Sequence, residues 1–272
     1  MRSKIRLQAV IVLMIAGIAV MAYPTLSHYI NTIHSSRAVQ ELSRQMQQTD
    51  SEVLQHQRAL AEEYNAALAG GAGEILAQYG QILDFGNGIM GSISIPKIGV
   101  ELSIYHGVSG GVLQKGVGHL PGSAFPIGGA GNHCILTGHT GLPSAELFTN
   151  LTQLQAGDAF YLRVLDGTLR YEIDQITVVL PHEVESLGPV RGRDYCTLVT
   201  CTPYGINSHR LLVRGERSPG DPPVTAAEEA PAGEDRVRLP GELILAGGAA
   251  AVLLAAIPVI LLRREPGEEG KT

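Results

Sequence analysis

A thiol, an imidazole and a guanidinium stand in sequence contexts that could support chemistry. Cys201 ends the pentapeptide Thr-Leu-Val-Thr-Cys, Arg210 follows nine residues later, and His139 lies upstream in Thr-Gly-His-Thr-Gly. A cysteine attacks as its thiolate, and an imidazole can carry the proton. A guanidinium stays charged and donates hydrogen bonds in a fixed fork, which suits an oxyanion. These three groups would together suffice for acyl transfer through a thioester.

Each of these residues also has a structural explanation. A cysteine is often a small buried apolar residue, and an arginine is usually a surface residue. His209 is the main rival to His139 because it lies close to Cys201 in sequence, but it alternates with Arg210, so only one of them can face the thiol. The remaining histidines are His28, His34, His56, His106, His119, His133 and His182.

The three cysteines, Cys134, Cys196 and Cys201, can be related by strand geometry. If residues 195–201 form one strand, Cys196 and Cys201 point to opposite faces, and a disulfide between them is not expected. A Cys134–Cys196 bridge stays geometrically open. The favoured interpretation is that both are buried as free thiols.

The elements that must position these residues read as β-strands between residues 89 and 216. Alternating apolar residues and β-rich runs are bounded by turn signals, with Asp166-Gly167 as a hairpin turn and one helix expected at 144–154. This pattern predicts an all-β fold, a small closed barrel. The expected strands lie near 93–98, 100–104, 133–136, 159–165, 169–173, 176–180, 195–200 and 210–213.

Two apolar runs flank this region. Residues 7–23 follow Arg2, Lys4 and Arg6 and end at Pro24, which predicts an uncleaved N-terminal membrane anchor or signal-anchor at 1–24; a cleaved signal peptide is the alternative. Residues 243–262 carry no charge and precede Arg263-Arg264, which predicts a transmembrane helix at 241–264. Basic residues outside both runs place both termini in the cytoplasm, including the tail at 265–272, and residues 24–240 outside the cell.

The segments between anchor and barrel differ in composition. Residues 25–68 predict a helical stalk, 69–90 a glycine-flanked flexible joint or lid-like segment, and 218–240 a disordered Pro/Glu/Ala-rich spacer. The formal net charge of −6, without a basic cluster, argues against nucleic-acid binding. Metal-binding spacings and phosphate or dinucleotide loops are missing from the sequence, so we expect no cofactor and no metal.

The chain closely resembles the sortases, which are membrane-anchored cysteine transpeptidases of Gram-positive bacteria. The resemblance rests on Leu198-Val-Thr-Cys201, Thr137-Gly-His139 and Arg210. Further stretches resemble class C, the pilin-polymerising branch, and the similarity covers about residues 25–217. These stretches are Gly88-Ile-Met-Gly-Ser-Ile-Ser-Ile-Pro-Lys-Ile98, Ile104-Tyr-His-Gly107, Leu113-Gln-Lys-Gly-Val-Gly-His-Leu120, Gly141-Leu-Pro-Ser-Ala145, Thr202-Pro-Tyr-Gly205 and His209-Arg-Leu-Leu-Val-Arg-Gly215.

The resemblance implies a closed eight-stranded barrel at 91–217 and assigns roles in the site. Cys201 would cleave a Leu-Pro-x-Thr-Gly-like sorting signal between Thr and Gly, His139 would serve as general acid and base, and Arg210 would hold the carbonyl or oxyanion. Thr200 is a weak candidate for substrate contact. The acceptor would be an amine, a pilin lysine in class C.

One departure from the class C pattern concerns the lid. Many class C members carry an Asp-Pro-aromatic lid, whereas Asp84-Phe85 here lacks the proline. Asp84 and Phe85 are therefore weak lid candidates.

Three other functions stay open. The acceptor could be a cell-wall peptide cross-bridge, the chain could be a cysteine peptidase that only hydrolyses, or it could be a non-enzymatic membrane-tethered β module.

Overall fold

The computed structural model describes residues 2–70, 73–86, 88–142, 145–183 and 187–220. The chain divides into two compact units. The larger unit, His28–Ala226, contains the barrel and the helices packed on it. In the smaller unit, Met1–Ser27 with Ala227–Thr272, the structure describes only helical residues 2–27.

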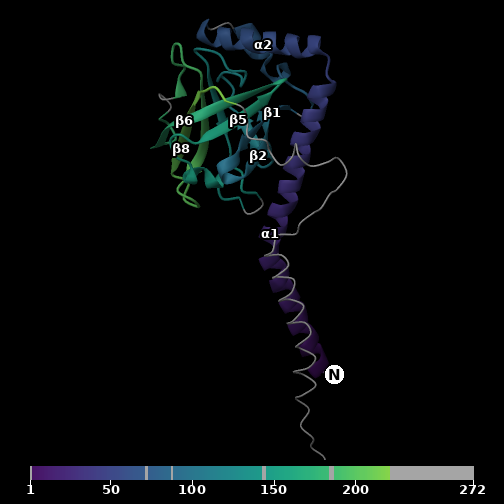
Figure 1. Ribbon diagram of the computed structural model, residues 1–272. Helices are drawn as coiled ribbons and strands as arrows, with labels where there is room; N and C mark the ends of the chain where they lie inside the picture. Colours follow the sequence, from purple (N-terminus) through teal and green to yellow (C-terminus); the bar gives the residue numbers. More distant parts are fainter. Residues whose placement is uncertain (1, 71–72, 87, 143–144, 184–186, 221–272) are drawn as a thin grey trace, which may run out of the picture. The chain divides into compact units, whose positions relative to one another are not determined.

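Eight strands close into a barrel, as predicted (Figure 1). Their order around the barrel is β1-β2-β3-β4-β7-β8-β6-β5, and β3 pairs parallel with β2, as does β4 with β7. The strands are β1 (Ile89–Ile95), β2 (Val100–His106), β3 (Val117–His119), β4 (His133–Thr137), β5 (Ala159–Val164), β6 (Gly167–Val179), β7 (Tyr195–Thr202) and β8 (His209–Arg217).

Several strand boundaries differ from the prediction. The runs at 169–173 and 176–180 belong to one long strand, β6, which contains a register shift between Ile173 and Gln175. Such a shift breaks the alternation and makes one strand read as two. Ile98 lies in a 3₁₀ turn, η2 (Pro96–Ile98), and the three-residue strand β3 was not predicted. The helix expected at 144–154 is a 3₁₀ helix, η3 (Thr149–Gln153), in the part of that range that the structure describes.

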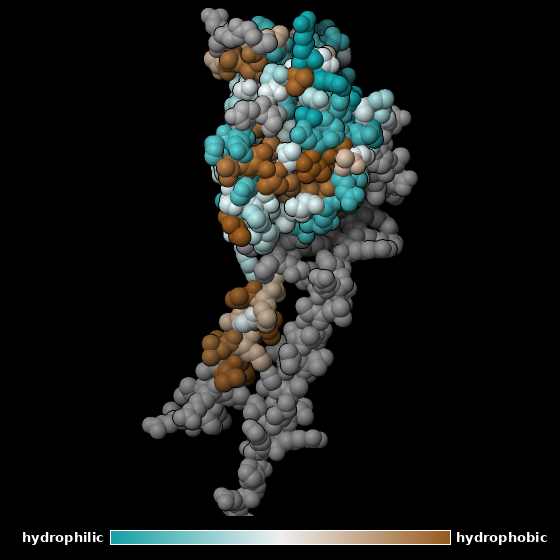
Figure 2. Space-filling model, turned by 90° about the vertical axis from the view of Figure 1, so that its left-hand side faces the viewer, coloured by the Kyte–Doolittle hydropathy of each residue, from teal (hydrophilic) through white to brown (hydrophobic). Residues whose placement is uncertain are grey.

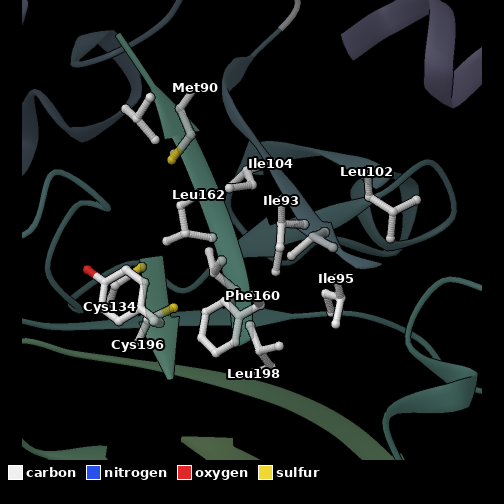
Figure 3. Packing of buried hydrophobic residues seen from close by; sticks show 14 of the residues in the cluster. Met90, Ile93, Ile95, Leu102, Ile104, Cys134, Phe160, Leu162, Cys196 and Leu198 are labelled. Carbon is white, nitrogen blue, oxygen red and sulfur yellow. The ribbon is translucent and has the colours of Figure 1, made fainter. Parts of the chain in front are cut away.

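Aliphatic and aromatic side chains from the inner faces of the strands fill the barrel (Figure 3). Phe160, Ile93 and Leu198 are fully buried, and Cys134 and Cys196 lie in the same core as free thiols. The favoured interpretation of these two cysteines is therefore confirmed. They are partners across β4 and β7 and carry no disulfide.

Two helices precede the barrel. Helix α1 (Arg2–Gln48) continues past Pro24, where the apolar run at 7–23 ends. Its later part buries Val39 and Leu42. Helix α2 (Ser51–Gly70) packs on the barrel through Asn65. The Asn65 side chain accepts a hydrogen bond from the Phe125 N–H (2.7 Å) and donates one to the Phe125 carbonyl (3.3 Å).

The lid-like segment after α2 is packed rather than free in the residues that the structure describes. It forms α3 (Gly73–Ala77) and the 3₁₀ turn η1 (Tyr79–Gln81), and Ile82 and Leu83 are fully buried. The Tyr79 hydroxyl contacts His119 Nδ1 at 3.0 Å and the Gly107 N–H at 2.9 Å. These contacts fix the segment to the ends of β2 and β3.

Among the residues that the structure describes, no helix has the length and apolar character needed to cross a membrane. The N-terminal anchor therefore gains no support here. The predicted span at 241–264, the tail at 265–272 and most of the spacer at 218–240 lie outside the described residues.

Candidate active site

Cys201 lies within β7, one residue before the strand ends. The preceding residues alternate between the two faces of the strand, so that Cys196 and Leu198 enter the core while Thr197 and Val199 share the face of Cys201. Cys201 is half-buried, whereas Cys134 and Cys196 are buried. The thiol is therefore on the outer face of the barrel, where a reagent or substrate can approach it.

Arg210 lies directly opposite Cys201 on the neighbouring strand β8. Side chains that face each other across an antiparallel pair have Cβ atoms about 4.5–5.5 Å apart and share one face. The Arg210 Nη1 donates to the carbonyls of Asn207 (3.2 Å) and His209 (3.0 Å), which orients the guanidinium at the start of β8. The strand register thus brings the cation to the side of the thiol.

His139 follows β4, on the other side of β7. Strands β4 and β7 are parallel, and Thr137 is the register partner of Val199. Two residues further along each strand direction, His139 is therefore level with Cys201. The Gly138 N–H continues this alignment by donating to the Val199 carbonyl at 3.0 Å. The backbone of β7 therefore places Cys201 between His139, which follows β4, and Arg210 on β8.

The backbone around His139 is fixed by Phe148. The buried Phe148 N–H donates to the His139 carbonyl at 3.1 Å, and its ring packs so tightly on Gly138 that a Cβ there would lie 2.7 Å from a ring carbon. Only glycine leaves room for this packing. The sequence signal for it is the glycine before His139, but Phe148 itself could not be found from sequence.

Thr200 is buried, and its hydroxyl donates to the Gly138 carbonyl at 2.7 Å. The side chain thereby ties β7 to the residue before His139. Because the hydroxyl is committed to this bond, the geometry gives no support to the weak prediction that Thr200 contacts substrate. It instead holds two members of the site in register.

His209 pairs with Thr202 across β7 and β8. It therefore shares the face of Thr202, while Arg210 shares the face of Cys201, as the alternation argument required. The imidazole of His209 contacts the Ser208 hydroxyl at 2.9 Å through Nδ1. This register favours His139 over His209 as the imidazole beside the thiol.

The two weak lid candidates lie in a turn before β1. Asp84 Oδ1 accepts from the N–H groups of Gly86 (2.9 Å) and Gly88 (3.1 Å) and so shapes this turn. Phe85 is half-buried and lines an open pocket of about 270 Å³ with residues at the end of α1, including Met46 and Thr49. These contacts join Asp84 and Phe85 to their own turn and to α1, and the lid role stays a prediction.

The chemistry of the arrangement follows from its parts. A half-exposed thiol is flanked by an imidazole that can exchange a proton and by a cation that can stabilise negative charge on oxygen. Exposed apolar side chains, Tyr204 and Ile206, lie in the loop that joins β7 to β8. Figure 2 views the side of β6 and β8 and shows apolar surface across the barrel. The thiol, the imidazole and the cation together suit acyl transfer through a thioester.

Comparison with known proteins identifies the family. The Sortase domain family model matches residues 93–218. The crystal structure of sortase C1 from Streptococcus agalactiae is similar over 68% of this chain and 100% of that chain, with 43% identity and a TM-score of 0.65. The chain belongs to the sortase family. The Streptococcus agalactiae structure and the sortase C structure from Streptococcus pneumoniae are class C sortases, and the similarity to them places the chain in that class.

Two further relatives define the extent of the similarity. The sortase C structure from Streptococcus pneumoniae, described in terms of catalysis and pilin substrate specificity, matches 69% of this chain and 100% of that chain, with 40% identity and a TM-score of 0.63. Sortase A from Streptococcus agalactiae serotype III is 30% identical over 131 residues, which cover 47% of this chain and 52% of that protein. The chain thus spans about half the length of this curated relative.

Proposed function

We propose that this class C sortase is a cysteine transpeptidase that cleaves a Leu-Pro-x-Thr-Gly-like sorting signal between Thr and Gly and transfers the Thr acyl group to an amine. The observation that carries the proposal is the register of three neighbouring strands. It sets Cys201 between His139 on one side and Arg210 on the other.

The reaction balances with these three groups. The Cys201 thiol passes its proton to His139, and its sulfur attacks the Thr carbonyl carbon. Arg210 donates hydrogen bonds to the oxyanion that forms. His139 returns the proton to the leaving glycine nitrogen as the C–N bond breaks, which leaves a thioester. An acceptor amine then attacks the thioester, His139 takes its proton, and the Cys201 sulfur leaves to regenerate the thiol.

The test uses the full chain in detergent with a fluorescent sorting peptide, with and without a small primary amine. We expect peptide cleavage between Thr and Gly, an amine adduct, and a mass shift on Cys201 equal to the acyl fragment. Cys201→Ala should abolish all three. Cleavage that gives only the free acid at every amine concentration would identify a cysteine peptidase and overturn the proposal.

For the acceptor, we propose the lysine amine of a pilin. Support comes from the overall similarity to class C sortases, one of which is described in terms of pilin substrate specificity. Incubation with purified pilin should produce covalent ladders that disappear when the acceptor lysine is replaced. If a cell-wall cross-bridge peptide is joined to the signal and pilin is not, the acceptor assignment is wrong.

We further propose that the catalytic unit works outside the cell and that the chain is held in the membrane by its apolar runs at 7–23 and 243–262. This part rests on the sequence alone, from the uncharged stretch before Arg263 and the basic residues before the first run. Protease added to intact protoplasts should digest the barrel and spare the tail at 265–272. Protection of the barrel until lysis would contradict this topology.

A further inference from the structure

The outer face of the sheet formed by β4, β7 and β8 is covered at one end and open at the other. Ile135 and Thr197 point away from the core yet are 5% and 1% exposed. Further along the same face, Val199 and Cys201 are half-buried. Something therefore covers the first part of this face and stops short of the thiol.

The covering element is the loop between β6 and β7, here called the β6–β7 loop, whose described residues are 180–183 and 187–194. Strand β6 ends with Val179 paired to Arg210, beside the thiol, whereas β7 begins at Tyr195 at the far end of the same sheet. The loop must therefore return along the sheet. Its residues 187–190 are largely exposed, so they form the outer layer there.

His133 ties this loop to the barrel. The ring is 3% exposed, and its Nδ1 contacts the Gly188 carbonyl at 2.9 Å. Its Nε2 contacts the Thr197 hydroxyl at 2.7 Å. His133 begins β4 opposite Tyr195, so the contact with Gly188 lies directly over the sheet face that leads to Cys201.

The hydrogen-bond partners define how the ring acts. A carbonyl can only accept, so Nδ1 carries a proton and donates to Gly188. Burial lowers the pKa of His133, which favours the neutral ring. Nε2 of the neutral ring then accepts from the Thr197 hydroxyl. The contact of Nε2 with Thr197 thus orients the His133 ring on β7, and the hydrogen bond from Nδ1 holds the β6–β7 loop.

We propose that His133 is a positioning residue that fixes the β6–β7 loop as a wall of the groove leading to Cys201, and so sets the affinity for the acyl-donor peptide. This inference rests on the proposed function. A peptide lying on the half-buried strip of Thr137, Val199 and Cys201 would have the loop beside it. His133 itself is buried beneath the loop and does not touch the substrate.

Two variants of similar size separate the tether from general packing. In His133→Asn, the side-chain amide takes the place of Nδ1 and keeps the hydrogen bond to the Gly188 carbonyl. In His133→Gln, the longer side chain places its amide at the position of Nε2, so the hydrogen bond to Gly188 is lost. In the full chain, His133→Gln should raise KM for the sorting peptide about three- to tenfold, the fold-change of one lost hydrogen bond, with kcat nearly unchanged. His133→Asn should stay close to the wild type.

Two readouts do not depend on turnover. Hydrogen exchange at the amides of Leu187, Gly188 and Val190 should be faster in His133→Gln than in His133→Asn. The rate at which a small thiol reagent modifies Cys201 should be the same in both variants, since the thiol itself is not moved. Equal KM values together with equal exchange rates in the two variants would overturn the proposal.

Thr197→Val provides a second route if His133→Gln does not fold. It removes the hydroxyl that orients the ring and leaves Nε2 of the buried imidazole unpaired, so the ring can turn away from Gly188; an asparagine has no atom at that position and does not have this freedom. We expect a higher KM with unchanged kcat, and wild-type values for KM and loop exchange would count against the proposal. If the wild-type chain transfers no peptide at all, the proposed function fails, while the exchange comparison still decides whether His133 holds the loop.

Discussion

The position of Arg210 is set by strand register and by backbone carbonyls at the turn before β8. Its Nη1 is held by the carbonyls of Asn207 and His209, and a guanidinium has five N–H donors in total. The remaining donors can therefore serve an oxyanion formed at Cys201, its partner across the strands. The charge is oriented before substrate arrives, which is what makes such a donor effective.

Removing this donor should affect the chemical step. Arg210→Ala should lower kcat for the sorting peptide by about 10²–10³-fold, the usual cost of one lost oxyanion donor. Arg210→Lys keeps the charge but loses the planar fork, so it should recover only part of the activity. Single-turnover acylation of Cys201 measures this step directly. Normal acylation in Arg210→Ala would show that the oxyanion is stabilised elsewhere.

The three thiols should differ sharply in reactivity. Cys201 is half-buried on the outer face, while Cys134 and Cys196 are 2% and 0% exposed inside the barrel (Figure 3). A small thiol reagent should therefore modify one cysteine in the folded chain and all three after unfolding, as counted by intact mass. In Cys201→Ala the folded count should fall to zero. Rapid labelling of Cys134 or Cys196 in the folded chain would contradict the closed core.

At the scale of the elements, the site depends on how β4 and β7 are joined beyond their regular pairing. Thr200→Val removes the hydroxyl that donates to Gly138, and the buried carbonyl loses its partner at a cost of about 1–3 kcal/mol in unfolding free energy. Because Gly138 precedes His139, we expect kcat to fall more than KM rises. Thr177→Val, a half-buried threonine on β6, is the matched control and should change neither.

The β4 histidine also predicts a pH effect on stability. Burial lowers the pKa of His133 below its ordinary value of 6.5 and the Arg214 cation lowers it further, while the Gly188 hydrogen bond and Asp174 oppose them; the Tyr195 ring packs beside it. Below pH 6.5 the unfolded chain binds a proton that the folded chain does not, so this group makes unfolding easier as pH falls towards the lowered pKa.

His133→Asn cannot titrate and should flatten this part of the curve. Denaturant unfolding of the wild type and His133→Asn across this pH window measures the difference in slope. An identical pH dependence in the two chains would show that His133 does not carry the effect.

Local patterns predicted those elements whose sequence reflects their own environment. The hairpin between β5 and β6 and the alternation that separates Cys196 from Cys201 follow from turn chemistry and strand period, and both are confirmed. The turn itself is Leu165-Asp166, one residue before the predicted Asp166-Gly167, because Gly167 pairs with Val164. Strand β3 could not be predicted, since three residues show no period. The tether at His133 could not be predicted either, because it joins residues 55 positions apart in the chain.

At the scale of the whole chain, the helical segments before the barrel were harder to predict from the sequence than the barrel. A short apolar piece between glycines has the same composition whether it moves or packs, and only tertiary contacts separate the two cases. The contacts of Tyr79 show that the segment packs here, because its hydroxyl contacts three groups at the ends of β2 and β3: His119 Nδ1, the His119 carbonyl and the Gly107 N–H. Burial raises the pKa of this hydroxyl, so it remains a donor at physiological pH.

The docking of α2 predicts that helix and barrel unfold together. Asn65 is buried and bonds both the N–H and the carbonyl of Phe125. The hydroxyl oxygen of Tyr64 beside it accepts from the Gly122 N–H at 3.2 Å. Asn65→Leu fills the same space but leaves the buried Phe125 N–H without its acceptor, whereas the Phe125 carbonyl keeps the hydrogen bond from the Ile127 N–H at 2.8 Å. We expect a loss of about 1–3 kcal/mol in unfolding free energy from this unpaired N–H.

Thermal unfolding followed by far-UV and near-UV circular dichroism tests this coupling. Both signals should shift to the same lower midpoint in Asn65→Leu, because loosening α2 exposes the barrel end that carries Phe125. Gln155→Leu, which makes the same kind of change at an exposed amide, should leave the midpoint near that of the wild type. A helix signal that melts early while the barrel keeps its wild-type midpoint would mean that α2 is an independent stalk, and the catalytic unit would then be the barrel alone.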